Sequence, residues 1–368
     1  MNIILKIKQL LILYLFLLGL FACSESFAYE VGGRFGKSCH EEIALPAFLE
    51  ALDTLAAFES NIDLPEDGTT LSLIRAIEET SREHGRPLSK KQAFILMSMM
   101  LGVRAHDLDG HASSNLAHTR AEHADDDDNA QYVHTLRGKN DDDDIGDAMA
   151  IEGTYRAVMD HVSQAYKFKS VTLSLFNIQQ KLYLDYYGRI DVTVNASAFH
   201  LGFAAHTIAD SFSHTIRSKQ DDFRKIITVM NYVEAIYPHY KESRDGIRHS
   251  AFTDDCTEEE NAPVVAAAVL ATREFEVAFE AFYATGDETP IRAFWEDWFQ
   301  LRTDCVHDYA ACDSEYYAEL AMRDPTHAYL ECQASVRRRP SPLSLALLLP
   351  FILPLAWGIW RRRSPQKP

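Results

Sequence analysis

Two histidines and an aspartate recur at intervals of four residues near the middle of the chain, as His206, Asp210 and His214. On an α-helix this spacing moves each side chain only about 40° around the axis, so all three project from one face. The residues between them are largely apolar, among them Ile208 and Phe212. The helix is therefore expected to lie inside the protein, where imidazoles and carboxylates need a partner. A metal ion suits this set, because His and Asp are common ligands of zinc.

The row also has two simpler interpretations. It could be the solvent-facing side of an ordinary amphipathic helix, or a hydrogen-bonded polar seam within a core. We favour a metal because three ligand-type residues share one face of a helix with few other polar residues. One helix supplies too few ligands to close a metal site, so the remaining ligands must come from other segments.

The segment 106–146 is the best source of further ligands. Five of the chain's 15 histidines lie between residues 106 and 134. They are His106, His111, His118, His123 and His134. The segment also carries two acidic runs, Asp125–Asp128 and Asp141–Asp144. Runs of like charge are usually solvated and mobile, and calcium binding at these acidic loops is the alternative.

Helical periodicity dominates the rest of the chain and predicts an all-α fold, a compact multi-helix domain. Ser89 and Gln92 form a capping-box pattern before an apolar run. The only weak sign of a strand is at Asp191–Val194. The expected helices are 40–58, 69–83, 90–105, 147–167, 171–187, 196–216, 220–240, 261–284 and 289–302.

The two ends of the chain are expected to lie outside this domain. Residues 1–28 combine a basic start, an apolar run and a small-residue ending, which is typical of a secretory signal peptide cleaved before Tyr29. Cleavage before Cys23, as in a lipoprotein, is the alternative. Residues 341–360 carry no charge and are bracketed by arginine triplets, which predicts a C-terminal transmembrane segment with a basic tail at 361–368. The sequence thus predicts an exported protein, anchored by its C-terminal helix in the bacterial cell envelope, in the periplasm or at the surface.

The domain between these ends, residues 29–336, is strongly acidic. Without Lys6, Lys8, Glu25 and the seven basic residues beyond 336, 27 basic and 53 acidic residues remain, a net charge of −26. Such a surface repels phosphate backbones, so we expect no duplex nucleic acid as a partner. The domain keeps five cysteines, Cys39, Cys256, Cys305, Cys312 and Cys332. We read them as structural, with Cys305 and Cys312 close enough in sequence to pair, while the other connectivity stays open.

The pattern Phe199-x-Leu201-Gly202-x-x-x-His206-x-x-x-Asp210-x-x-x-His214 resembles the zinc-dependent phospholipase C superfamily, which also contains the single-strand-specific nucleases. The chain looks like a divergent bacterial branch, because His214 follows Asp210 more closely than in the secreted phospholipases. The resemblance implies an all-α fold of the zinc phospholipase C type with two or three zinc ions. It also implies that His206 and His214 each bind a zinc and that the carboxylate of Asp210 bridges two.

The resemblance extends to other positions one residue at a time. Family members ligate zinc through the mature N-terminus and a histidine about ten residues later, which correspond here to Tyr29 and His40. An aspartate ahead of the central helix corresponds to Asp107 or Asp109, each also a candidate general base. The histidine that follows is assigned to His134, with His118 and His123 as rivals. The last ligands are assigned to His249 with Asp254 or Asp255, and His239 with Glu242 is the other possibility.

Taken together, these residues predict an exported, membrane-tethered zinc hydrolase that acts on phosphoesters, with phospholipid head groups as the favoured substrate. Metal ions in such a site activate water and clamp phosphoryl oxygens. A single-strand nuclease is the second interpretation, although nucleic-acid grooves are usually basic and aromatic. The third is a non-catalytic, metal-stabilised protein of the cell envelope or surface.

Overall fold

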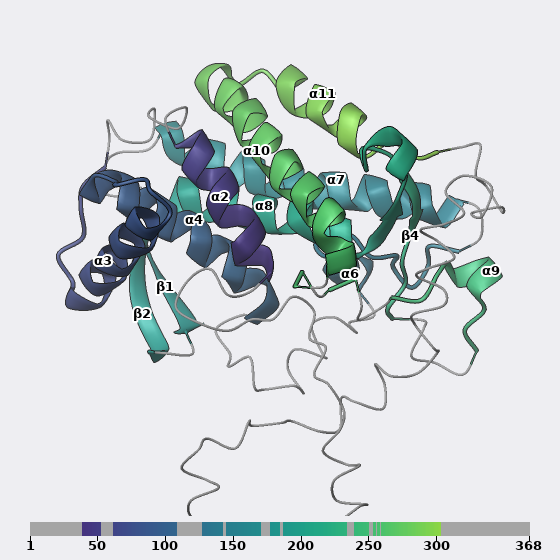
Figure 1. The fold of residues 1–368 in the computed structure, drawn as a ribbon, viewed down its shortest axis with the longest axis horizontal. Coiled ribbons are helices and arrows are strands. Elements are labelled where there is room, and N and C mark those ends of the chain that lie inside the picture. Colours follow the sequence, from purple (N-terminus) through teal and green to yellow (C-terminus); the bar gives the residue numbers. More distant parts are fainter. Residues whose placement is uncertain are drawn as a thin grey trace, which may run out of the picture. The chain divides into compact units, whose positions relative to one another are not determined.

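Helix α8 (Ala196–Ser213) occupies the middle of the structure, and other helices cover it on several sides (Figure 1). Asn195 begins it by accepting a hydrogen bond from the backbone N–H of Ala198, the usual role of an N-cap residue. Almost every residue of α8 is buried, including His206 and Asp210. The computed structural model describes residues 39–52, 62–108, 127–142, 145–170, 177–184, 187–233, 239–249, 253–254, 256–257 and 259–302, all within one compact unit of the chain.

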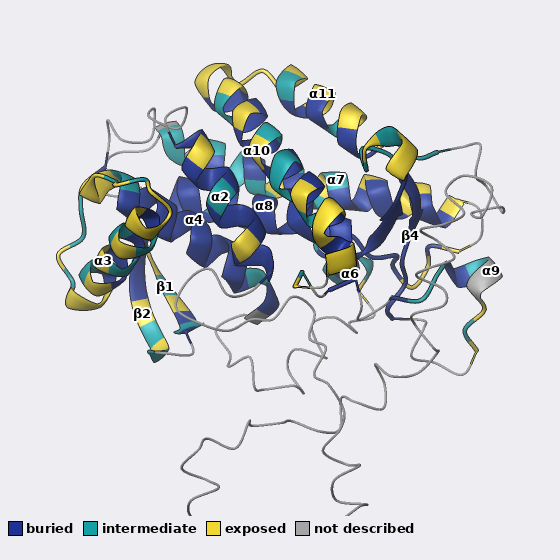
Figure 2. Ribbon diagram, viewed as in Figure 1, coloured by how far each residue is buried: buried dark blue, intermediate teal, exposed yellow. Residues whose placement is uncertain are grey.

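Long helices make up most of the described chain, which confirms the mostly helical fold. Helix α8 packs most extensively against α4 (Lys90–Leu108) and α7 (Gly146–Lys167), and also against α10 (Ala262–Thr285) and α2 (Cys39–Ala51). Figure 2 shows α4 and α8 buried along most of their length, whereas α10 and α11 (Thr289–Trp298) expose one side. The other helices of the described residues are α3 (Gly68–Glu83) and the short α6 (Asp128–Tyr132) and α9 (Glu242–Asp245), with 3₁₀ turns at Phe168–Ser170, Lys219–Asp221 and Glu259–Asn261.

Two glycines set the distance between α4 and α8. A Cβ atom on Gly102 of α4 would lie 2.1 Å from the carbonyl oxygen of Phe199, and one on Gly202 of α8 would lie 2.0 Å from that of Met99. No other residue fits at either position, because the two backbones are in direct contact. This close crossing brings the C-terminal turn of α4, with Asp107, beside the polar row of α8.

Two predicted helices are wrong, because these segments hold strands. Within 171–187, strand β1 (Asn177–Leu184) pairs antiparallel with β2 (Gly188–Asn195), from Asn177↔Asn195 to Leu184↔Gly188. Leu182 and Leu184 are buried on alternate positions of β1, and short apolar runs of this kind do not distinguish strand from helix by spacing alone. The predicted weak strand 191–194 belongs to β2.

The second wrong helix is 220–240, which contains strand β4 (Ile226–Val229). Its four residues are all buried and all β-branched, a composition that favours a strand. It pairs antiparallel with β3 (Thr215–Arg217), which begins two residues after the end of α8. The predicted helix 196–216 is therefore too long, since α8 ends at Ser213.

The predicted capping box is present at the start of α4. The backbone N–H of Ser89 donates to Oε1 of Gln92, and the N–H of Gln92 donates to Oγ of Ser89. Within the residues that the structure describes, no helix is both long and apolar enough to cross a membrane. The predicted signal peptide 1–28 and the predicted membrane segment 341–360 lie outside these residues.

Candidate metal centre

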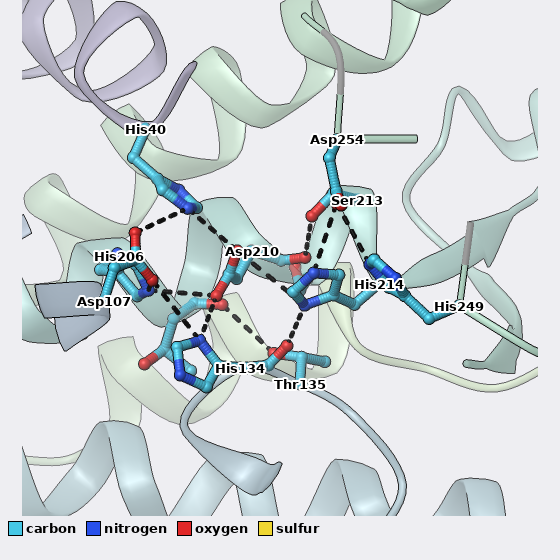
Figure 3. A network of polar contacts seen from close by, with 12 residues as sticks. His40, Asp107, His134, Thr135, His206, Asp210, Ser213, His214, His249 and Asp254 are labelled. Atoms are coloured by element: carbon cyan, nitrogen blue, oxygen red, sulfur yellow. Dashed lines mark hydrogen bonds and ion pairs between the residues drawn. The ribbon is translucent and has the colours of Figure 1, made fainter. Parts of the chain in front are cut away.

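Four of the predicted ligands converge below the start of α2 (Figure 3). We define them as Site 1: His40 of α2, Asp107 of α4, and His206 and Asp210 of α8. One ligand atom from each lies within 4.8 Å of the others, and all four residues are buried. Nε2 of His40 is 3.2 Å from Oδ1 of Asp210, and Nε2 of His206 is 3.4 Å from Oδ1 of Asp107. Three separate segments therefore supply one compact set of nitrogen and oxygen donors.

A second set, Site 2, consists of His214, His249 and Asp254, which are also buried and equally close together. Oδ1 of Asp254 lies 3.2 Å from Nε2 of His249 and 3.5 Å from Nε2 of His214. Of the predicted pairs for the end of the site, the structure thus brings together His249 with Asp254. His239 belongs to neither site.

The end of α8 joins the two sites. The four-residue spacing predicts His214 on the helix, but in the structure His214 is the C-cap residue that follows it. Its backbone N–H donates to the carbonyl of Asp210 at 3.0 Å. Its ring is thereby turned toward Site 2, while its Nδ1 remains 3.9 Å from Oδ1 of Asp210. Asp210 thus contacts residues of both sites, which suits a bridging carboxylate.

His134 lies against Site 1 and also orients a residue of Site 2. Its Nδ1 is 2.8 Å from Oδ2 of Asp210, and its backbone carbonyl accepts a hydrogen bond from Nδ1 of His214. Because Nδ1 of His214 carries that proton, Nε2 is the nitrogen with a free lone pair in the neutral ring, and it faces Asp254. Thr135 follows with a φ of 52°, a left-handed conformation that is uncommon for a β-branched residue. Its hydroxyl donates to the carbonyl of Thr207 in α8, which anchors the turn beside the site.

A buried ion pair lies next to His40 and was not predicted from the sequence. Glu41 is fully buried, and its Oε1 accepts a hydrogen bond from Nε of Arg104 at 2.5 Å. Glu41 follows His40 on α2, and Arg104 precedes Asp107 by three residues on α4. The pair therefore holds together the two helices that carry Site 1 ligands. The only sequence signal for it is an acid directly beside a candidate ligand.

Burial and charge perturb the pKa values of the site residues in opposite directions. Burial lowers the pKa of His40 well below its ordinary value and raises that of Asp107. Burial alone would also raise the pKa of Asp210, but the charges of His214, His40 and His206 outweigh it and hold that pKa well below its usual range. Asp210 is thus an ionised carboxylate in the centre of an imidazole cluster.

The donor set fits a divalent metal ion. Oδ1 of Asp210 and both ring nitrogens of His206 are buried yet make no hydrogen bond of ordinary geometry. Buried polar atoms without such bonds are costly, and metal coordination would satisfy them. Two buried His/Asp clusters that could hold metal ions are therefore present among the described residues.

Of the remaining predicted site residues, most lie outside the described part of the chain. Those outside the described residues are Tyr29, Asp109, His111, His118, His123 and Asp255. His106 is described and borders Site 1, with its ring 5.0 Å from that of His206.

The acidic runs agree only in part with the expectation that they are solvated, because Asp127 and Asp142 are exposed whereas Asp141 is buried. Asp127 caps α6, and Oδ1 of Asp128 accepts from the backbone N–H of Lys139. Asp141 is buried and accepts from the N–H of Gly138 and the hydroxyl of Tyr132. Among these described aspartates, the carboxylates are bound to the protein itself, and none belongs to a metal-binding group.

Comparison with known proteins adds no relative: no family model, no curated protein and no solved structure matches this chain.

Proposed function

We propose that the chain is a zinc-dependent phosphoester hydrolase of the phospholipase C type, acting on phospholipid head groups. The observation that carries the proposal is the convergence of seven buried His and Asp side chains, from distant segments, into two adjoining sites that share contacts with Asp210. The sites would hold two or three zinc ions through His40, Asp107, His206 and Asp210 on one side and His214, His249 and Asp254 on the other. When bound, such ions supply a nucleophile from water at neutral pH and neutralise charge on phosphoryl oxygens.

The protein's own residues have separate tasks in this proposal. Asp210 provides a permanent negative charge between the sites, and His134 fixes the orientation of both Asp210 and His214. Asp107 is the candidate general base, because burial raises the pKa of its carboxyl toward the range in which it can accept a proton at neutral pH. Asp109 retains the same candidacy from the sequence.

We also propose that the protein is exported and held at the bacterial envelope by its C-terminal segment. The basic and apolar pattern of residues 1–28 and the uncharged stretch 341–360 support this. The disulfide between Cys39 and Cys256 fits an oxidising compartment.

The test combines metal content with turnover. The purified chain should contain zinc by elemental analysis and should hydrolyse a phosphatidylcholine analogue faster than single-stranded DNA. Asp210→Asn should lose the zinc of Site 1 and hydrolysis, whereas Asp191→Asn, at an exposed position of β2, should lose neither. A zinc-loaded chain that leaves all phosphodiesters intact would refute the enzymatic proposal.

A non-catalytic, metal-stabilised envelope protein is the second candidate, and the burial of the sites favours it. His206 and Asp254 have no exposed surface in the structure, and closed sites are typical of structural zinc. Asp107→Asn separates the two candidates. Hydrolysis lost while zinc and thermal stability are retained supports the enzyme, whereas loss of stability in a chain without hydrolysis supports the structural role.

A further inference from the structure

A pair of histidines outside both sites faces each other between α7 and α8. Nδ1 of His161 lies 3.3 Å from Nδ1 of His200. Both side chains are partly exposed, in contrast to the buried ligands of Sites 1 and 2. His106 lies between this pair and Site 1, with its ring 5.3 Å from that of His161 and 5.0 Å from that of His206.

Aromatic packing holds both rings in place. The ring of His161 stacks on Phe203 with a centroid distance of 4.7 Å and an interplanar angle of 9°. The ring of His200 stacks on Phe168 at 5.8 Å and 12°. Because each imidazole is already oriented, a ligand between them would need little rearrangement.

The spacing of the two nitrogens matches coordination of one ion. Zinc binds imidazole nitrogen at about 2.0–2.1 Å with tetrahedral geometry, which places two ligand nitrogens about 3.3 Å apart. Burial lowers the pKa of His161 to about 4 and also lowers that of His200, so both rings are neutral at physiological pH. Neutral imidazole is the form that binds metals.

Asp160 is the neighbouring candidate for a third donor. Asp160 directly precedes His161, and its charge acts on both rings, raising their pKa values against the larger effect of burial. The carboxylate of Asp160 is exposed and is not grouped with the two rings as the structure stands, so it would have to turn toward an ion between them. Two nitrogens, one carboxylate oxygen and water would complete a four-coordinate site with an open position.

We propose that His161 and His200, with Asp160, form a separate binding site for a divalent transition metal ion, of which zinc is the test case. The hydrogen bond between the rings occupies this place in the metal-free chain. One ring shifts its proton from Nδ1 to Nε2 when both Nδ1 atoms coordinate, so no proton is released. This site is independent of the proposed hydrolase activity.

The test counts zinc ions on the full chain. Protein stripped with a chelator is titrated with zinc alone, and the bound equivalents are measured in wild type and in His161→Gln/His200→Gln. The double variant should bind one equivalent fewer, and His200→Gln alone should weaken that ion by about tenfold or more, since even outer-shell changes cost this much. His84→Gln, at an exposed position after α3, should change nothing.

Two further variants keep the outcome unambiguous. Asp210→Asn should remove zinc from Site 1 but leave the His161/His200 ion bound, which separates this proposal from the proposed function. If the double variant unfolds, judged by circular dichroism, the half-exposed His200→Gln single variant decides. An unchanged zinc count and affinity in a folded variant, or binding only at millimolar zinc, overturns the proposal.

Discussion

The disulfide between Cys39 and Cys256 connects the two candidate metal sites. Cys39 directly precedes His40 of Site 1, and Cys256 follows Asp254 of Site 2 by two residues. The cysteines are 217 residues apart in sequence. One covalent bond thus restrains a ligand of each site and holds the start of α2 beside Cys256.

Breaking this bond should weaken both the fold and the metal sites. Cys39→Ala/Cys256→Ala is expected to lose about 2–5 kcal/mol of unfolding free energy, because the bond closes a long loop in the unfolded chain. Denaturant unfolding measures this loss, and elemental analysis should show less retained zinc. Wild type in a reducing agent should reproduce the variant, and full zinc retention in both would contradict the link between the disulfide and the sites.

The contact between Gly102 and Gly202 should tolerate no side chain. Gly202→Ala would place its Cβ 2.0 Å from the carbonyl oxygen of Met99, so α4 and α8 would have to separate. We expect a loss of about 3 kcal/mol or more in unfolding free energy, at the upper end for overpacked cores. The matched control is Gly68→Ala, where a Cβ meets nothing within 4 Å and φ is not positive. Equal stability of the two variants would show that the crossing is looser than this.

The sequence identifies the core of the candidate site well because the information is local. The spacing of His206 and Asp210 places both on one helix face, and the structure retains that arrangement. The resemblance to zinc phospholipases added His40, Asp107, His249 and Asp254, which the fold brings together from distant segments. The convergence of these residues depends on how the helices pack, which cannot be predicted from the spacing of residues in the sequence.

The features that the sequence does not predict depend on contacts between distant segments or on local backbone conformation. The Cys39–Cys256 pairing was open, because several connectivities fit the same cysteines. The end of α8 at Ser213, which moves His214 into Site 2, depends on β3 pairing with β4 in the tertiary structure. The sequence does not indicate the His161/His200 pair, because each is a single histidine on a different helix.

Glu276 of α10 should destabilise the protein increasingly as pH rises. Its side chain is fully buried, neither oxygen has a hydrogen-bond partner, and burial raises its pKa well above 4.5. The unfolded chain releases this proton above about pH 4.5 while the folded chain keeps it. Stability is therefore full below that pH and falls above it, by at most about 1.4 kcal/mol per pH unit.

Glu276→Gln removes this titration and should match wild type near pH 4 but exceed it at neutral pH. Urea unfolding at several pH values measures the difference. Glu296→Gln, at an exposed position of α11, is the control and should follow wild type throughout. A constant difference between Glu276→Gln and wild type across this range would mean that Glu276 is ionised in the folded chain.

His214 should make the stability of the metal-free chain fall as pH rises, whereas zinc binding at Site 2 should strengthen as pH rises. Burial would lower its pKa, but the charges of Asp210 and Asp254 and the hydrogen bonds to Asp254 and to the carbonyl of His134 raise it to about 9. A raised histidine pKa stabilises the fold fully below about pH 6.5, and this contribution, at most about 3 kcal/mol, is lost as pH rises toward about 9. Zinc needs the neutral ring, so its binding at Site 2 should instead strengthen over the same interval and release protons.

Two measurements on one preparation check the predicted pH dependence of stability and that of zinc binding. Chelator-treated wild type should lose unfolding free energy between about pH 6.5 and about pH 9, and His214→Gln should show a flatter profile over that interval. Calorimetric zinc titrations in buffers of different ionisation enthalpy should detect proton release in wild type and less of it in His214→Gln. Because the proton and the metal compete for the same ring, a zinc affinity that is independent of pH would place His214 outside the metal's coordination sphere.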